Sequence, residues 1–560
     1  MTRLRSIITA LAAVVMAAAL AACAGLPVDG PVHVGRAIDE VERLPDFDFV
    51  PAGPVADATP QQIVEGFVAA GSGPRGNWET AQDFLTPEFR EVWKPQAGVT
   101  IHAAGNRAFE VAGEDEVVLT VQPVARVDET GAYEPSGEGE ITMRYRLVQQ
   151  DGQWRIAEAP DGIVLDANGF STVFRSYSLA YFDPSWDSLV PDLRWFPATN
   201  PATRIAAAIV GGSPSPWLSR SVRTAFPGDV SLTQPAVPVD AGVAQVSLSA
   251  NARDLGSETL ARMKTQLERS LSDARVVEVQ MLVGDEVLDV PTVTVREHRV
   301  DARPLVLVEG EFGFLSGSEV DVLPELSAAL GSLDEEVESI EVDEQRTTAA
   351  VRTATGAILR VSAGGAVTPL DTRAGMTAPS IDPFGHIWTS PGRVPTEVVA
   401  YGPDGSARLV EGGWPGATSV SSMRVSRDGT RVAALVRDGA QPAVWVAGIV
   451  RDEDGVPTTL SEPVLVSALS GEGVELTWLA ADRLALVWTD GEQHVMREQP
   501  IGGEGSEVRA PDDVVAIAGG NQSGTVRLRT ADGGLFVQRG SWQFLASDVT
   551  VLAVQQGTPR

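Results

Sequence analysis

The stretch Met423-Arg424-Val425-Ser426-Arg427-Asp428-Gly429 determines the fold that we predict for the C-terminal half of this chain. A short strand pattern runs into Ser-Arg-Asp-Gly, a composition that favours a tight turn. Related segments of a strand followed by a small or acidic turn recur on both sides. They are Ser339–Val342, Ser380–Pro383, Leu476–Leu479 and Val515–Ala518. Their spacing of roughly 40 to 50 residues predicts the four-stranded blades of a β-propeller.

The ends of this repeat region predict how the ring closes. From about Arg303 onward the sequence consists of short strands and Gly/Asp turns, and Pro324–Leu330 is the one segment with a helical pattern. The widest gap between repeat copies coincides with an insertion at Arg451–Gly455. Val549–Val554 is a further strand pattern, and we expect Leu305–Val308 to complete its blade. Residues 303–560 are therefore predicted to be an all-β propeller of about six blades.

The preceding segment, residues 171–300, mixes strands and helices. Strand patterns cover Ala180–Asp183, Leu193–Phe196, a stretch around Val222–Phe226 and Val243–Ser249. Helices are expected from Pro201 and over about Glu258–Ala274, where Leu260, Met263, Leu267 and Leu271 have helical spacing. The order of these elements predicts a small α+β domain.

An earlier α+β domain is predicted over residues 59–168. Thr59 can cap a helix, Pro60 suits its first turn, and Gln62 completes a capping box. Asp151-Gly152 predicts a hairpin turn. The expected strands are Ala108–Val124, Gly139–Val148 and Gln153–Ala159. Helices followed by a curved antiparallel sheet resemble the NTF2-like cone.

The N-terminus has the pattern of an export signal. Arg3 and Arg5 precede an apolar run over Ile7–Leu20, which is too short for a comfortable membrane span. The ending Leu-Ala-Ala-Cys resembles a lipobox, and Cys23 is the only cysteine in 560 residues. We therefore expect residues 1–22 to be a lipoprotein signal peptide, cleaved between Ala22 and Cys23. Cys23 would then carry an S-diacylglycerol and an N-acyl chain, and residues 23–58 would form a tether. An ordinary signal peptide cut near the same alanines is the alternative.

The charge of the chain limits its partners. With 43 basic and 75 acidic residues, the formal net charge is −32. A surface this acidic repels phosphate backbones, which argues against nucleic acid. It is also repelled by anionic lipid, so the lipid anchor and the tether would have to hold the protein at the membrane.

Sequence signatures of catalysis are missing. No G-x-S-x-G, H-E-x-x-H or Walker loop occurs. Gly71–Gly76 matches G-x-G-x-x-G but follows a helix, and Asp452–Gly455 lacks the glutamate of a calcium loop. The histidines His33, His102, His298, His386 and His494 are scattered and are interpreted as structural. Glu335-Glu336 and Asp343-Glu344 would serve a glycosidase only by facing each other across a cleft. We predict no enzymatic activity, no catalytic residue, no cofactor and no metal.

The domain order resembles a known family. The motifs Leu-Val-Pro at 189–191, Gly-Gly-Ser-Pro-Ser-Pro at 211–216 and Ala-Gln-Val-Ser-Leu-Ser at 244–249 resemble the GerMN domain. The whole order, together with Cys-Ala-Gly-Leu-Pro-Val-Asp-Gly-Pro-Val at 23–32, resembles the LpqB family of actinobacterial lipoproteins. The resemblance implies a protein on the outer face of the cytoplasmic membrane that binds the extracytoplasmic part of the sensor kinase MtrB. It implies an influence on MtrA phosphorylation, and so on envelope homeostasis and division.

Two other functions stay open at this point. A cell-wall-binding structural lipoprotein would bind peptidoglycan without changing kinase output. An exported glycan-acting enzyme would need acidic residues that converge in the propeller channel or in the GerMN cleft.

Overall fold

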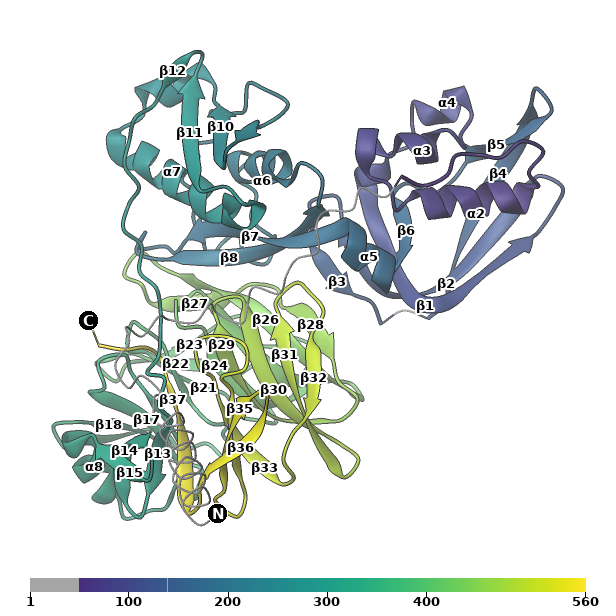
Figure 1. The fold of residues 1–560 in the computed structure, drawn as a ribbon. Coiled ribbons are helices and arrows are strands. Elements are labelled where there is room, and N and C mark those ends of the chain that lie inside the picture. Colours follow the sequence, from purple (N-terminus) through teal and green to yellow (C-terminus); the bar gives the residue numbers. More distant parts are fainter. Residues whose placement is uncertain (1–49, 138, 560) are drawn as a thin grey trace, which may run out of the picture. The chain divides into compact units, whose positions relative to one another are not determined.

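The computed structural model describes residues 50–137 and 139–559. The signal peptide, Cys23, His33 and most of the tether lie outside the described residues. Figure 1 labels the elements along the chain, and we refer to an N-terminal, a middle and a C-terminal region. Within the described part of the chain, no helix combines the length and apolar character that crossing a membrane requires.

The N-terminal region packs helices on a mixed sheet. Its helices are α2 (Pro60–Ala70), α3 (Glu79–Gln82) and α4 (Pro87–Arg90), with 3-10 turns at Arg75–Asn77 and Pro95–Ala97. Its strands are β1 (Gly98–Val111), β2 (Glu116–Asp128), β3 (Tyr133–Pro135), β4 (Ile141–Gln150), β5 (Gln153–Glu158) and β6 (Ile163–Asp166), followed by α5 (Ala167–Val173). The sheet order is β5-β4-β2-β1-β6, with β3 paired to β2, and α2 lies across one face (Figure 1). Apolar side chains of α2 and of alternate β2 positions form one core.

Local sequence signals explain most of this region. The predicted capping box is confirmed: the Thr59 amide donates to the Gln62 side-chain oxygen at 2.9 Å, and the Gln62 amide donates to Thr59 Oγ1 at 3.3 Å. The Asp151-Gly152 hairpin is also confirmed, with φ of 52° and 77°. A single strand over Ala108–Val124 is wrong, because the polar run Gly-Glu-Asp-Glu at 113–116 turns the chain between β1 and β2.

The middle region is built around two helices. It comprises β7 (Phe174–Phe182), β8 (Leu189–Pro197), α6 (Pro201–Val210), β9 (Val239–Asp240), β10 (Val243–Ser247), α7 (Ser257–Leu271), β11 (Glu278–Val283) and β12 (Glu286–Val287), with 3-10 turns at Ala250–Asp254 and Ser272–Ala274. β7 and β8 form a hairpin, and the second sheet has the order β12-β11-β10-β9. The expected strand around Val222–Phe226 is wrong, because only Arg223 bridges to Phe182.

The C-terminal region consists almost entirely of short antiparallel strands. Its first elements are β13 (Leu305–Val308), β14 (Glu311–Ser316), β15 (Glu319–Val322), α8 (Pro324–Gly331), β16 (Val337–Val342), β17 (Thr348–Thr353), β18 (Ile358–Ser362), β19 (Val367–Asp371), β20 (Ser380–Ile381), β21 (Ile387–Thr389), β22 (Val399–Tyr401) and β23 (Ala407–Leu409). Next come β24 (Ala417–Val425), β25 (Arg431–Asp438), β26 (Gln441–Arg451), β27 (Pro457–Leu460), β28 (Val464–Ala468), β29 (Glu472–Ala480), β30 (Arg483–Asp490), β31 (Gln493–Pro500) and β32 (Ser506–Arg509). The last are β33 (Val514–Ala518), β34 (Arg527–Thr530), β35 (Leu535–Arg539), β36 (Ser541–Ala546) and β37 (Val549–Gln555).

These strands form consecutive four-stranded units. β20–β23, β29–β32 and β33–β36 are separate sheets, and β24–β27 gain a fifth strand because β28 also pairs with β26. The hairpin between β26 and β27, which holds the insertion, and the additional strand β28 account for the widest repeat spacing. The remaining sheet has the order β15-β14-β13-β37-β16-β17-β18-β19. β13 pairs antiparallel with β37, so the predicted pairing of the two ends of the region is confirmed.

The sequence repeat identifies one particular strand of each unit. The five repeat copies lie at β16, β20, β24, β29 and β33, each the first strand of its unit in chain order. Successive members of this set contact one another, and β37 contacts both β33 and β16. β37 and β16 run parallel. These six inner strands therefore form a closed ring whose strand ends meet on one face.

A buried charge cluster joins the inner strands. Arg424 on β24 donates to Glu475 Oε1 on β29 at 2.5 Å, and its Nε lies 3.6 Å from Glu341 Oε2 on β16. Glu341 Oε1 accepts bonds from Ser380 Oγ at 2.9 Å and from Gln556 Nε2 at 2.5 Å. Burial raises the pKa of Glu341 and of Glu475, and Arg424 opposes that shift. The cluster thus connects strands that are far apart in sequence.

Replacing Arg424 should reveal this dependence. Arg424→Met keeps the length of the side chain but leaves two buried carboxylates without their cation, and we expect it to destabilise the protein by about 3–5 kcal/mol. Arg437→Met is the matched control, because the side chains of the Arg437–Glu472 pair are 32% and 67% exposed, against 4% for Arg424. It should cost less than about 1 kcal/mol. Urea unfolding followed by tryptophan fluorescence measures both, and equal stability of the two variants would contradict the role of the cluster.

Candidate functional site

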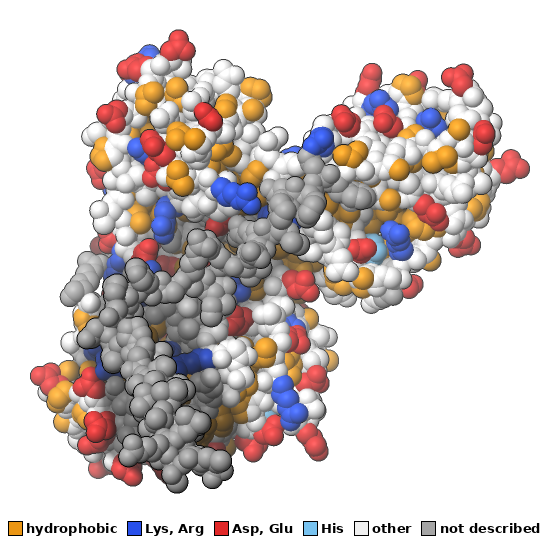
Figure 2. Space-filling view, in the orientation of Figure 1, with side chains coloured by type: hydrophobic (Ala, Val, Ile, Leu, Met, Phe, Trp, Pro, Cys, Tyr) orange, Lys and Arg blue, Asp and Glu red, His pale blue; other side chains and the backbone are white. Residues whose placement is uncertain are grey.

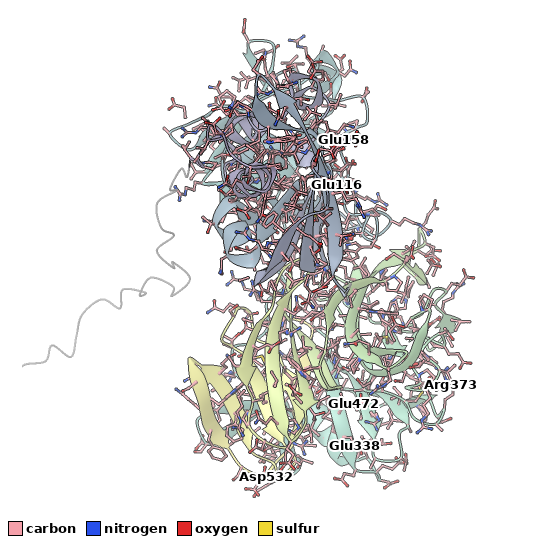
Figure 3. All side chains as sticks on the ribbon, turned by 90° about the vertical axis from the view of Figure 1, so that its right-hand side faces the viewer. Glu116, Glu158, Glu338, Arg373, Glu472 and Asp532 are labelled. Atoms are coloured by element: carbon pink, nitrogen blue, oxygen red, sulfur yellow. The ribbon has the colours of Figure 1, made fainter. Side chains whose placement is uncertain are left out.

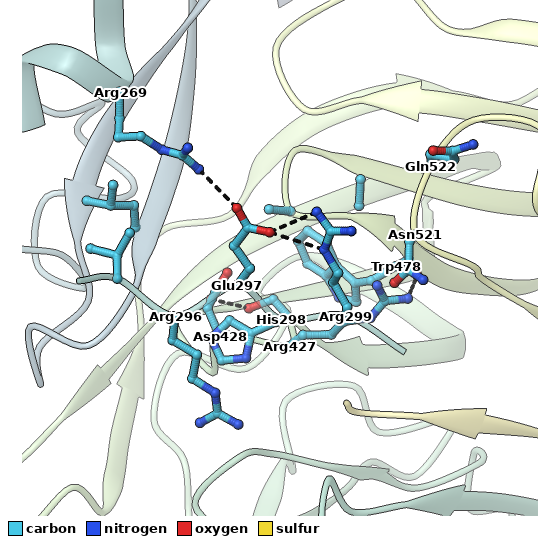
Figure 4. A pocket seen from close by; sticks show the side chains of 15 residues that line it. Arg269, Arg296, Glu297, His298, Arg299, Arg427, Asp428, Trp478, Asn521 and Gln522 are labelled. Atoms are coloured by element: carbon cyan, nitrogen blue, oxygen red, sulfur yellow. Dashed lines mark hydrogen bonds and ion pairs between the residues drawn. The ribbon is translucent and has the colours of Figure 1, made fainter. Parts of the chain in front are cut away.

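A pocket opens where the inner strands β24, β29 and β33 end. Figure 4 shows the side chains that line it. Its volume is about 290 Å³. One wall comes from the inner-strand ends, and the other comes from the segment that leaves the middle region. The lining residues are Leu189, Arg269, Val295, Arg296, Glu297, His298, Arg299, Ser426, Arg427, Asp428, Trp478, Ala480, Ala481, Asn521 and Gln522.

The segment 295–303 is bonded to this face of the ring. The Asn521 side chain accepts from the Val300 amide at 2.8 Å and donates to the Val300 carbonyl at 2.9 Å. The Asp301 amide donates to Gln555 Oε1 at 3.1 Å, and Arg296 forms an ion pair with Glu344. These partners follow, or end, three different inner strands. The segment is therefore a fixed wall of the pocket.

Arg427 is a positively charged residue of the pocket with a lowered pKa. It lies in the turn after β24, and its Nη2 donates to the carbonyls of Trp478 at 2.9 Å and Gly520 at 2.7 Å. Burial lowers the pKa of Arg427 to about 10, and the nearby Arg527 adds to the shift. The guanidinium thus stays charged at neutral pH, and it makes no ion pair with a carboxylate of the described residues.

The outer part of the pocket holds a shared carboxylate. Glu297 pairs with Arg299 at 2.9 Å and with Arg269 at 3.7 Å, as Figure 4 shows. All three side chains are at least half exposed. Two arginines therefore share one acid, so this part of the pocket carries an excess of positive charge in a chain with a formal net charge of −32.

Ser426, Asp428 and His298 lie together but do not form a catalytic triad. Ser426 Oγ donates to Asp428 Oδ1 at 2.7 Å and accepts from the Arg431 amide at 3.0 Å, so its hydroxyl is committed to the turn. In a triad the imidazole would stand between the serine and the carboxylate. Burial lowers the pKa of His298, and its Nε2 is buried without a hydrogen-bond partner.

The carboxylates considered for glycan chemistry serve other contacts. Glu335 accepts from Thr355 Oγ1 at 2.6 Å, and Asp343 accepts from the Thr347 amide at 2.7 Å. Glu344 pairs with Arg296. Glu341 and Glu475 come closer to the geometry of two facing acids, but both bond to Arg424 and neither lines the pocket.

The histidines do not converge. His102 Nδ1 lies 2.8 Å from the Ala103 carbonyl, His386 Nδ1 lies 3.5 Å from Asp382, and His494 is on β31. Of the four histidines that the structure describes, His298 alone lines the pocket. Across residues 50–137 and 139–559, no three metal-ligating side chains come together.

Sequence reasoning missed Arg427 and Arg299 as site residues. Arg427 stands inside the turn that marks the repeat, so its position was visible, but the direction of its side chain was not. Arg299 lies beyond the last strand of the middle region. No sequence pattern there indicates that the chain lies against one face of the ring.

Three family models match successive parts of the chain. The model for the N-terminal domain of lipoprotein LpqB matches residues 53–171, and the LpqB beta-propeller model matches residues 313–551. The Germane model, described as sporulation and spore germination, matches residues 179–289 between them. The chain belongs to the LpqB family of lipoproteins. Recognition of this family from the sequence is thereby confirmed, as is the order of its domains.

Named relatives extend the match along the chain. Lipoprotein LpqB of Nocardia farcinica is 27% identical over 516 residues, covering 83% of each chain. Lipoprotein LpqB of Bifidobacterium longum is 25% identical over 591 residues, covering 98% of this chain and 99% of its own length. That of Cutibacterium acnes is 30% identical over 287 residues, covering 50% of this chain and 47% of its own. A solved nidogen/laminin complex chain aligns with a TM-score of 0.31 at 11% identity over 43% of this chain and 89% of its own, a likeness too weak to carry an argument.

Acid should weaken the contribution of Asp428 to stability. Burial acts to raise the pKa of Asp428, but Arg431 and the hydroxyls of Thr430 and Ser426 outweigh it and lower the pKa from 3.8 to about 2. A depressed pKa stabilises the fold above the unfolded value and loses that effect as the pH falls through the folded value. Asp428→Asn should thus cost about 2 kcal/mol at pH 7, and about 1 kcal/mol less at pH 3 than at pH 5. Urea unfolding at each pH tests this, and a cost that does not change with pH would contradict it.

Proposed function

We propose that this protein is a lipid-anchored extracytoplasmic accessory protein that binds the sensor kinase MtrB and modulates MtrA–MtrB signalling. The observation that carries the proposal is the domain order: an LpqB N-terminal domain, a Germane domain and an LpqB propeller domain, in one chain. Through MtrA phosphorylation, this role would affect envelope homeostasis and cell division.

The proposal places the protein on the outer face of the cytoplasmic membrane. Cys23 would carry the S-diacylglycerol and N-acyl anchor after removal of residues 1–22, and residues 23–58 would be the tether. Two or more acyl chains hold a protein stably where one would not. Domains would cover residues 59–168, 171–300 and 303–560, with an NTF2-like first domain and about six blades in the third.

The surface chemistry fits a protein partner. Acidic side chains are scattered with arginines over the visible face (Figure 2). Glu116 and Glu158 on the N-terminal region, and Glu338, Glu472 and Asp532 on the C-terminal region, are examples (Figure 3). Such a surface supports electrostatic steering toward a basic patch on a partner. It opposes binding of nucleic acid.

Catalysis has less support than binding. Ser426 is committed to a turn, and the facing acids Glu341 and Glu475 are bound by Arg424. We therefore assign no enzymatic activity and no catalytic residue. A cell-wall-binding structural lipoprotein is the second candidate, and an exported glycan-acting enzyme the third.

The lipid anchor is tested on Cys23. Wild-type protein should take up a clickable fatty acid in the cell and fractionate with membranes. Cys23→Ala removes the only thiol in the chain and should abolish both, because the acceptor sulfur is lost. Ala24→Ser, one residue further on, should retain the label. An unlabelled wild-type protein released from the cell would instead support an ordinary signal peptide.

The kinase partnership is tested with both full-length proteins in the same nanodisc. We expect saturable binding to MtrB with a Kd below about 100 μM, tightening as salt is lowered because the acidic surface attracts a basic partner. Autophosphorylation of MtrB should change when the protein is added. A sensor kinase of an unrelated two-component system, in the same nanodiscs, is the control.

Absence of binding to MtrB in a shared membrane would overturn the proposal. Retention on purified peptidoglycan, with unchanged kinase output, would then support the wall-binding role.

A further inference from the structure

We propose that the pocket between segment 295–299 and the inner-strand ends binds a small oxyanion, a molecule that carries a phosphate or carboxylate group. The ligand would contact Arg427 from the ring and Arg299 from the segment. This inference does not depend on the kinase partnership.

The first argument is an unneutralised cation. Arg427 lines the pocket, and its Nη2 bonds only to the carbonyls of Trp478 and Gly520. Nε and Nη1 make no hydrogen bond to the described residues. The Arg427 side chain is partly buried, and a partly buried guanidinium is stabilised best by an anion that it can contact in a bidentate manner. The pocket leaves space for that anion beside the guanidinium.

The second argument is a neighbouring arginine in the same condition. Arg527 is 4% exposed and donates to the carbonyls of Gly519, at 3.1 Å, and Ala302. It too makes no ion pair with a carboxylate of the described residues. Arg427 and Arg527 thus donate to adjacent carbonyls of the Gly519-Gly520 loop, and they repel each other. The two like charges add to the positive potential on this face of the ring, with Asp301 offsetting part of the charge of Arg527.

The third argument is the polarity of the outer wall. Glu297 is shared by Arg299 and Arg269, which leaves an excess cation at the mouth (Figure 4). The buried Nε2 of His298 lacks a hydrogen-bond partner in the same pocket. Donors thus come from both walls, which is the arrangement that an oxyanion requires.

The pocket size indicates a small organic ligand. About 290 Å³ exceeds what a single inorganic ion fills, since a water molecule occupies roughly 30 Å³, and it lies at the lower end of small-molecule sites. A bound anion would bridge the segment and the ring. Ligand binding should therefore stabilise the attachment of the segment at Val300 and Asn521.

Calorimetric titration of the full-length chain in detergent tests the site. The probes are glycerol 3-phosphate, succinate and inorganic phosphate, at constant low ionic strength so that screening stays weak. We expect saturable binding of at least one probe, with a Kd between about 10 μM and 1 mM. Binding of the phosphate compounds alone assigns a phosphate ligand, and binding of succinate alone assigns a carboxylate ligand.

Four variants locate the site. Arg427→Gln should abolish binding, and Arg299→Gln should weaken it about tenfold through loss of a charge-assisted bond. Glu297→Gln should tighten binding at least about threefold, because it frees two arginines from their shared acid. A general loss of structure would not strengthen binding. Arg408→Gln, on the exposed outer strand β23, is the matched control and should bind like wild type.

Two outcomes would overturn the proposal. One is the absence of saturable binding of every probe to the wild type. The other is wild-type affinity in both Arg299→Gln and Glu297→Gln, whose exposed side chains can be changed without threatening the fold.

Discussion

The ion pairs of Arg424 with Glu341 and Glu475 are the constraint on which the C-terminal region depends. They join β16, β24 and β29, while Glu341 also holds Ser380 of β20 and Gln556 beyond β37. The Ile517 amide of β33 donates to Glu475 Oε2 at 3.0 Å, so five inner strands bond to the cluster directly and β37 is linked to it through Gln556, the residue that follows it. Apolar side chains packed between neighbouring units do not specify register. Hydrogen bonds and ion pairs to buried charges do specify register, because a buried charge that lacks a partner destabilises the fold.

Closure of the ring has a consequence at one of its faces. Parallel inner strands end together, so the turns after β24, β29 and β33 converge on one face although they come from distant parts of the sequence. The segment that leaves the Germane domain is bonded to the same face through Val300, Asp301 and Arg296. The pocket therefore exists only because two domains meet there. Its lining holds four arginines and two acidic residues, Glu297 and Asp428, in a chain with a formal net charge of −32.

A lipoprotein with this construction is suited to binding. The described residues offer a closed ring of strands, a segment after the Germane domain that is bonded to the ring, and many exposed acidic side chains. Ser426, His298 and Asp428 all line the pocket, but the hydrogen bonds of Ser426 and Asp428 serve the turn and His298 Nε2 has no hydrogen-bond partner among the described residues.

The sequence alone determined the local features of this protein. Thr59 and Gln62 capped their helix, Asp151-Gly152 made its hairpin, and the repeat marked the inner strands, because these signals depend on neighbouring residues. It also sufficed for the family and for the pairing of β13 with β37. It did not place the turn between β1 and β2 or the lone bridge at Arg223. Only the tertiary structure decided which charges meet: Arg424 is separated by 51 residues from Glu475, and Val300 by 221 from Asn521. Pairing over such separations depends on how the closed ring brings the ends of the inner strands together. No local sequence pattern predicts it.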